Sequence, residues 1–103
     1  MHKPMSAKET QRITSLNDLR KYVLSILCQH EQLELDAFPF SERLLVRGNQ
    51  PCGMFFSLRG PRSVLFSAIW ETDRNTILFY NSIGERFRQI FLAQAPQLSA
   101  SGA

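Results

Sequence analysis

The chain has 103 residues, of which 44% are hydrophobic and 20% are charged. This length allows one domain, because a single core usually occupies about 100 to 150 residues, and the composition excludes intrinsic disorder. No apolar run approaches the roughly 20 residues that span a bilayer, and no signal peptide is recognisable, so we expect a cytoplasmic protein that is not bound to a membrane.

The formal net charge of +3 is unevenly distributed along the chain. Residues 1–42 carry five Lys/Arg against six Asp/Glu, whereas residues 43–103 carry seven arginines against three acids. The planar guanidinium group binds carboxylates and phosphates bidentately and stacks on rings. The second half therefore suits an acidic partner, although arginines that face water would also serve solubility.

The two ends of the chain differ from its middle. Residues 1–13 are polar and aperiodic, and residues 95–103 are rich in Pro, Ser and Gly. Such ends are usually poorly ordered unless they are held by a core. We expect mobile tails at 1–13 and 95–103, around a single domain at 14–94.

The domain begins with an amphipathic helix. Ser15 followed three residues later by Asp18 indicates a helix start, and apolar residues then recur at helical spacing. This pattern predicts a helix over residues 16–31.

Strands separated by turns follow the helix. We predict strands over residues 43–47, 54–59, 63–71 and 76–80, with turns at 48–51, 59–62 and 72–75. In the third strand, alternation places Val64, Phe66, Ala68 and Trp70 on one face and Leu65, Ser67 and Ile69 on the other. Both faces are partly apolar, as is typical of a central strand.

Residues 81–92 fit two structures. Ser82 and Glu85 match a capping box ahead of a helix. Residues 81–84 equally match a type I turn with Gly84 at its last position, followed by a returning strand. The alternation of Arg86, Phe87 and Arg88 favours a fifth strand over residues 86–92.

These elements predict an α+β domain of two layers, in which the helix packs on an antiparallel meander of four or five strands. We place Trp70 at the rim of the core, where its N–H can find a partner. The predicted core consists of Leu19, Val23, Ile26, Leu27, Leu45, Phe56, Leu58, Phe66, Ala68, Ile77 and Phe79.

Candidate binding residues are the arginines on or beside the strands. Rings among guanidinium groups are how some sheets hold single-stranded nucleic acid, but Arg59-Gly60 is followed by proline and not by the signature of RNA-binding sheets. The candidates are Arg47, Arg59, Arg62, Arg74, Arg86 and Arg88, accompanied by the rings of Phe55, Phe66, Tyr80 and Phe87.

Two short segments suggest phosphate chemistry. The turn at residues 59–62 places two guanidinium groups at a hairpin tip, where they could clamp a phosphate or carboxylate; the same turn residues would also simply satisfy turn geometry. Residues 44–47 resemble, over four positions, the phosphotyrosine-pocket strand of SH2 domains. That resemblance implies phosphate binding by Arg47 and requires a helix at the end of the domain.

The residues that usually perform catalysis are sparse. His30 closes an apolar helical stripe, and Cys52 has no neighbouring base or helix N-terminus to activate it. Two histidines and two separated cysteines, Cys28 and Cys52, do not suit a zinc site or a disulfide. We therefore expect no catalytic residues, no metal and no cofactor, and a small enzyme is only a third hypothesis.

The leading functional hypothesis is a non-catalytic binding or assembly module that acts through an open sheet face or an edge strand. Its partner would be another protein or a second copy, giving a homodimer. The alternative is nucleic-acid or phospholigand binding through the arginine-rich sheet and the 59–62 turn.

Overall fold

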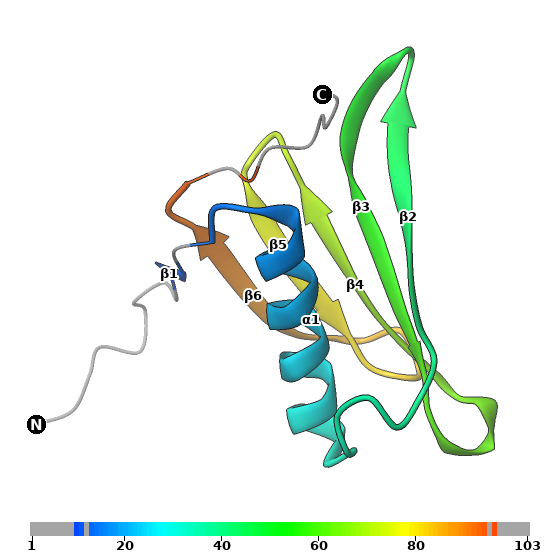
Figure 1. The fold of residues 1–103 in the computed structure, drawn as a ribbon. Coiled ribbons are helices and arrows are strands. Elements are labelled where there is room, and N and C mark those ends of the chain that lie inside the picture. The colour runs from blue at the N-terminus through cyan, green and yellow to red at the C-terminus, as the bar shows by residue number, and fades with distance from the viewer. Residues whose placement is uncertain (1–9, 12, 95, 97–103) are drawn as a thin grey trace, which may run out of the picture.

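The computed structural model describes residues 10–11, 13–94 and 96. A single helix packs against one face of a sheet whose strand order is β1-β6-β5-β4-β3-β2 (Figure 1). The elements are β1 (Thr10–Gln11), α1 (Leu16–Glu31), β2 (Phe40–Arg47), β3 (Gln50–Arg59), a 3-10 turn (Pro61–Ser63), β4 (Leu65–Glu71), β5 (Thr76–Tyr80) and β6 (Arg86–Leu92).

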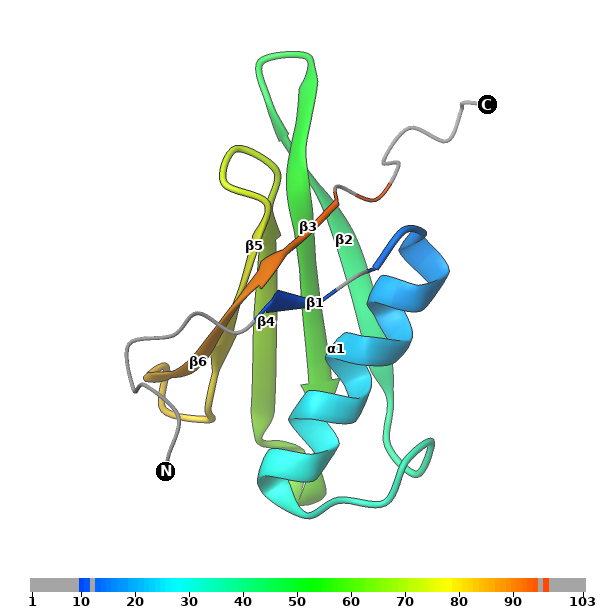
Figure 2. The same cartoon turned by 90° about the vertical axis from the view of Figure 1, so that its left-hand side faces the viewer.

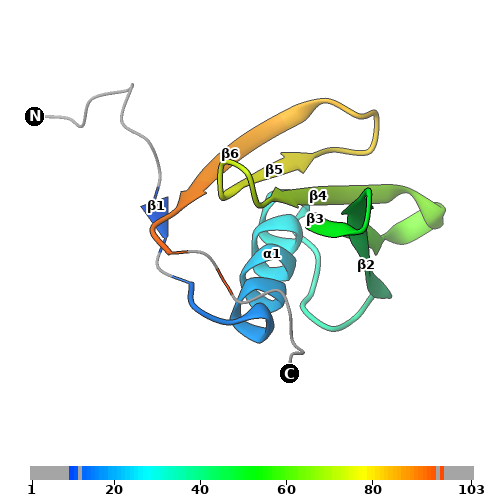
Figure 3. The ribbon, with the colours of Figure 1, turned by 90° about the horizontal axis from the view of Figure 1, so that it is seen from above.

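The predicted fold class is confirmed. Strands β2 to β6 form a five-strand antiparallel meander, and the helix lies on one side of it (Figures 2 and 3). The β2–β3 hairpin extends beyond the other strands, because the pairing of β3 with β4 begins only at Gly53. Among the described residues, no helix has both the length and the apolar character needed to cross a membrane.

The short strand β1 was not predicted. Its backbone pairs in parallel with β6 at Phe91 and Leu92, and Ile13 just after it is buried in the core. Residues 10, 11 and 13 fall in the expected N-terminal tail, yet they belong to the sheet and the core. Pro96, in the expected C-terminal tail, is also buried. The rest of both expected tails lies outside the described residues.

Helix α1 has the bounds that its sequence predicts, and both ends are capped. The Ser15 hydroxyl accepts a hydrogen bond from the backbone N–H of Asp18 at 3.1 Å, as expected of an N-cap. At the other end Gln32 adopts the left-handed conformation, with φ of 58°, and its N–H bonds back to the last turn. The buried stripe of the helix is Leu19, Val23, Ile26, Leu27 and Cys28.

The choice between helix and strand for the last element is settled by Asn81. Its side-chain oxygen accepts hydrogen bonds from the N–H groups of Ile83 at 3.1 Å and Glu85 at 2.9 Å. Gly84, with φ of 84°, completes the turn, and its N–H bonds to the Asn81 carbonyl. The chain therefore reverses, and residues 86–92 return as the predicted fifth strand.

The core lies between α1 and the sheet. Residues paired directly across antiparallel strands point to the same face, so the buried row Met54, Trp70, Ile77 and Ile90 faces the helix. The prediction of Trp70 at the rim was wrong: its side chain is 1% exposed, and its Nε1 donates to Asn75 Oδ1 at 2.9 Å inside the fold.

Ten of the eleven predicted core residues are buried, and Leu45 is the exception. Leu45 pairs with Gly53 and lies on the face away from the helix, where it is only half-buried. Its neighbour Leu44 points to the helix side but is 46% exposed. Neither residue reaches the core, because β2 is the edge strand.

Several strand ends differ from the prediction. Strand β2 begins at Phe40 and β3 already at Gln50, so residues 50 and 51 are strand residues and not part of the turn. Strand β4 begins at Leu65, because the preceding residues form the 3-10 turn. Val64, expected beside Phe66 on one strand face, lies outside the strand and is 38% exposed.

Candidate functional site on the open face of the sheet

The side of the sheet opposite α1 is not covered by any described element (Figure 3). We call it the open face. It consists of the strand residues that alternate with the core positions, and direct cross-strand pairing arranges them in rows that run across the sheet.

The central row of the open face is apolar. Phe55 pairs with Ile69, and Ile69 pairs with Leu78. Phe55 and Ile69 are half-buried, and Leu78 is nearly buried by its neighbours. Three large apolar side chains on adjacent strands thus form a continuous row, of which Phe55 and Ile69 remain partly exposed. The sequence predicted this apolar character for Ile69 in the third strand.

A hydroxyl row runs beside the apolar row. Ser41, Ser57, Ser67 and Tyr80 follow one another across four neighbouring strands. The hydroxyl oxygens of Ser41 and Ser57 are 2.9 Å apart, within hydrogen-bond distance. Adjacent strands lie about 4.8 Å apart, so the row offers evenly spaced groups that can both donate and accept hydrogen bonds.

Positive charge borders these rows. The guanidinium carbon of Arg43 lies 5.1 Å from the centre of the Phe55 ring, in the geometry of a cation–π contact. Arg59 pairs with Leu65 and Arg86 pairs with Tyr80, so both lie on the open face. Glu71 is the acidic strand residue on this face. Three guanidinium groups against one carboxylate give the open face a positive balance.

The six predicted arginines do not form one cluster. Arg59 and Arg86 lie on the open face. Arg47 and Arg74 lie at the opposite end of the sheet, where Arg47 Nη1 is 3.7 Å from Asp73 Oδ2 and both side chains are more than 70% exposed. Such an exposed pair stabilises little. Arg88 pairs with Phe79 and is half-buried on the helix side.

Arg62 lies outside the strands. It lies in the 3-10 turn with φ of 61°, and the next residue, Ser63, has φ of 63°. The predicted simple hairpin turn at 59–62 is therefore a longer connection containing two consecutive left-handed residues. Each costs roughly 1–3 kcal/mol for a residue with a side chain. Hydrogen bonds from the Gly60 N–H to the Val64 carbonyl and from the Val64 N–H to the Pro61 carbonyl hold the connection.

The candidate rings divide between the two faces. Phe55 and Tyr80 lie on the open face, but Phe66 is buried under the helix. Phe87 stacks on the imidazole of His30 with ring centres 3.6 Å apart. His30 therefore contributes to packing between α1 and β6.

Sequence reasoning missed Arg43 as a site residue. The signal was present, because Arg43 and Leu45 alternate with Leu44 in the same strand. What the sequence does not contain is the register that pairs Arg43 with Phe55. The resemblance to the SH2 phosphate strand fails, because the domain ends in strand β6 and not in a helix.

Other reactive groups lie apart from the open face. Burial raises the pKa of the Cys28 thiol, with a smaller contribution from Asp36. Cys52 is half-buried in β3 and not in a loop. On the helix side, a hydrogen bond to Glu42 raises the pKa of Arg20. Within the described ranges, no cluster of His, Cys, Asp or Glu is suited to hold a metal ion.

Three comparisons with known proteins found no relative of this chain. No protein-family model matches the chain, and neither a curated protein nor a solved structure is significantly similar to it.

Proposed function

We propose that this protein is a non-catalytic binding or assembly module and that the open face is its binding surface. The observation that carries the proposal is the apolar row at the centre of the open face, in which Phe55 and Ile69 are partly exposed beside the nearly buried Leu78. Contiguous apolar surface on a soluble protein commonly marks an interaction site. The surrounding hydroxyl and guanidinium groups resemble the polar rim of protein interfaces.

The first partner to test is a second copy of the chain. A homodimer through the open face would bury the apolar rows of both copies, and serine hydroxyls are self-complementary because they donate and accept. Sedimentation at several protein concentrations measures this directly. We expect the apparent mass of the wild-type protein to rise with concentration.

A pair of matched substitutions locates the contact. Ile69→Lys places a charge in the apolar row and should keep the protein monomeric. Ile83→Lys makes the same chemical change in the β5–β6 loop, where Ile83 is 74% exposed, and should associate like the wild type. A strictly monomeric wild-type protein would contradict the homodimer, and equal association of both variants would contradict the assignment to the open face.

The positive balance of the open face supports a second candidate, which is binding of nucleic acid or another phosphate-bearing ligand. Arg43, Arg59 and Arg86 lie on the same face as the ring of Phe55, and stacking on rings beside cations is a mode of single-strand binding. Binding to single-stranded and double-stranded nucleic acid should then weaken steeply as salt increases. Lack of binding at low salt would eliminate this candidate.

A further inference from the structure

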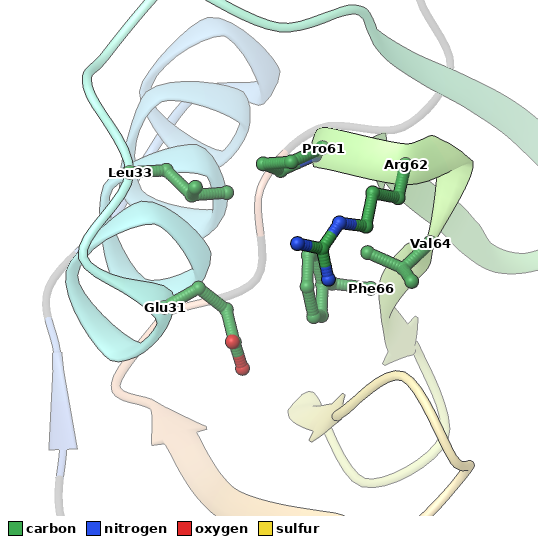
Figure 4. A pocket seen from close by; sticks show the side chains of 6 residues that line it. All are labelled: Glu31, Leu33, Pro61, Arg62, Val64 and Phe66. Carbon is green, nitrogen blue, oxygen red and sulfur yellow. The ribbon is translucent and has the colours of Figure 1, made fainter.

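A hollow lies away from the open face, between the end of α1 and the β3–β4 connection (Figure 4). Its volume is about 300 Å³, which is at the small end of pockets that bind small molecules. We call it the 62-pocket. It is lined by Glu31, Leu33, Pro61, Arg62, Val64 and Phe66.

Apolar side chains line the 62-pocket from both sides, with Leu33 on the side of α1 and Val64 and Phe66 on the side of the β3–β4 connection. Gly60 permits this arrangement. A Cβ at position 60 would lie 2.8 Å from Phe66 Cε2 and 3.4 Å from Leu33 Cδ1, so a larger residue would displace the ring.

Two opposite charges face into the 62-pocket. Figure 4 shows the guanidinium group of Arg62 and the carboxylate of Glu31 directed into the same space from the two sides. Among the described residues, no carboxylate lies within 4.0 Å of the Arg62 guanidinium. Glu31 Oε2 is 3.5 Å from His30 Nε2. The carboxylate can still accept a hydrogen bond from a ligand, because an ionised carboxylate has about four lone-pair sites.

The backbone at Arg62 and at Glu31 has features that favour binding of a charged ligand. Arg62 and Ser63 are held in left-handed conformations that side chains rarely adopt, and strained residues of this kind concentrate at ligand sites. Glu31 is the last residue of α1, where the helix dipole adds negative potential to the carboxylate and favours a cation. The arrangement thus provides an anion site and a cation site beside apolar side chains.

We propose that the 62-pocket binds a small zwitterion with an apolar side chain, of the class of the aliphatic α-amino acids. The ligand's carboxylate binds the Arg62 guanidinium, which suits carboxylates through two parallel N–H donors. Its ammonium group binds Glu31, and its side chain packs on Phe66 and Leu33. This site does not depend on the open face, so either proposal can fail without the other.

The test is a titration of the protein followed by the NMR shifts of its backbone amides. L-leucine is the probe, with two analogues that each lack one charge: 4-methylpentanoate without the ammonium group and 3-methylbutylamine without the carboxylate. We expect leucine to produce saturable shifts at residues 31–33 and 62–66. Loss of a charge-assisted contact should weaken each analogue by roughly tenfold or more.

Variants assign the two contacts. Arg62→Asn keeps a residue that tolerates the left-handed conformation and should weaken leucine binding by about tenfold while leaving the amine unchanged. Glu31→Gln should weaken leucine and leave the carboxylate analogue unchanged. Arg74→Asn, an exposed position in the β4–β5 turn at the other end of the sheet, is the control and should bind leucine normally. The proposal is overturned if leucine gives no saturable shifts there, or binds no more tightly than both analogues.

Discussion

The two cysteines occupy environments that should give them different reactivity. Cys28 is 3% exposed on the core side of α1, and burial raises the pKa of its thiol. A raised pKa means that less reactive thiolate is present at neutral pH, and burial also excludes the reagent. Cys52 is half-buried at the projecting end of β3.

We predict that an alkylating reagent modifies Cys52 in the native protein and Cys28 only after unfolding. Counting modified thiols by mass spectrometry with and without denaturant measures this, and the variants Cys28→Ala and Cys52→Ala identify each signal. Protection of Cys28 should amount to more than about a thousandfold, since buried groups react through opening that costs several kcal/mol. Equal native rates for the two thiols would show that Cys28 is not held in the core.

The positions of single residues could be predicted from the sequence only where they depend on one element. Alternation and helical spacing identified most core positions, because they follow from the geometry of one element. Trp70 was misplaced because its partner Asn75 lies in the next turn. That side chain accepts from Trp70 and donates to the Leu92 carbonyl at 3.2 Å, which connects the β4–β5 turn to the end of β6. Such a network depends on three segments and cannot be read from one.

At the scale of elements, the end of α1 is the place where a local change should stabilise the protein. Gln32 has φ of 58° and an exposed side chain, and glycine is the residue preferred at this left-handed position.

We predict that Gln32→Gly raises the free energy of unfolding by roughly 0.5–1 kcal/mol, because it removes the conformational cost of a side chain there. Urea denaturation followed by circular dichroism measures the change. Gln32→Ala is the matched control, since it also removes the side chain beyond Cβ but keeps the unfavourable φ, and it should not stabilise. Destabilisation by glycine would mean that the Gln32 side chain makes contacts that hold the helix end.

The last strand shows how two local patterns compete within one element. Residues 81–85 carry signals for a helix start and for a turn, and helical spacing alone cannot distinguish them. The turn prevails because Asn81 satisfies two backbone N–H groups and Gly84 supplies the positive φ. The strand also receives a pairing partner on each side, β5 and β1, and a helix could use neither.

Across the whole molecule, the sheet separates the hydrophobic core on its helix side from the proposed binding surface on its open face. The helix side contains the core and the Arg20–Glu42 pair, and the open face contains the apolar and hydroxyl rows. The six arginines of the predicted site lie at different places on the sheet, because nearness to a strand in the sequence does not determine which face a side chain occupies. The face and the sheet end to which each belongs depend on strand order and register, which the composition does not determine.

Phe55 and Phe56 offer a test of this separation, because they are neighbours in β3 on opposite faces. Phe56 is fully buried, with its ring 5.9 Å from that of Phe40, so Phe56→Ala should lower the free energy of unfolding by about 3–5 kcal/mol. Phe55 is half-buried beneath Arg43, so Phe55→Ala should cost the monomer only about 1 kcal/mol, the loss of partial burial and one exposed cation–π contact.

The two variants should also differ in how stability depends on protein concentration. If the open face joins two copies, association stabilises the folded state, and the urea midpoint of the wild type rises with concentration. We predict that this rise disappears in Phe55→Ala, whose interface is damaged. It should persist in a milder core variant, Phe56→Leu, whose interface is intact. A wild-type midpoint that does not change with concentration would contradict self-association through the open face.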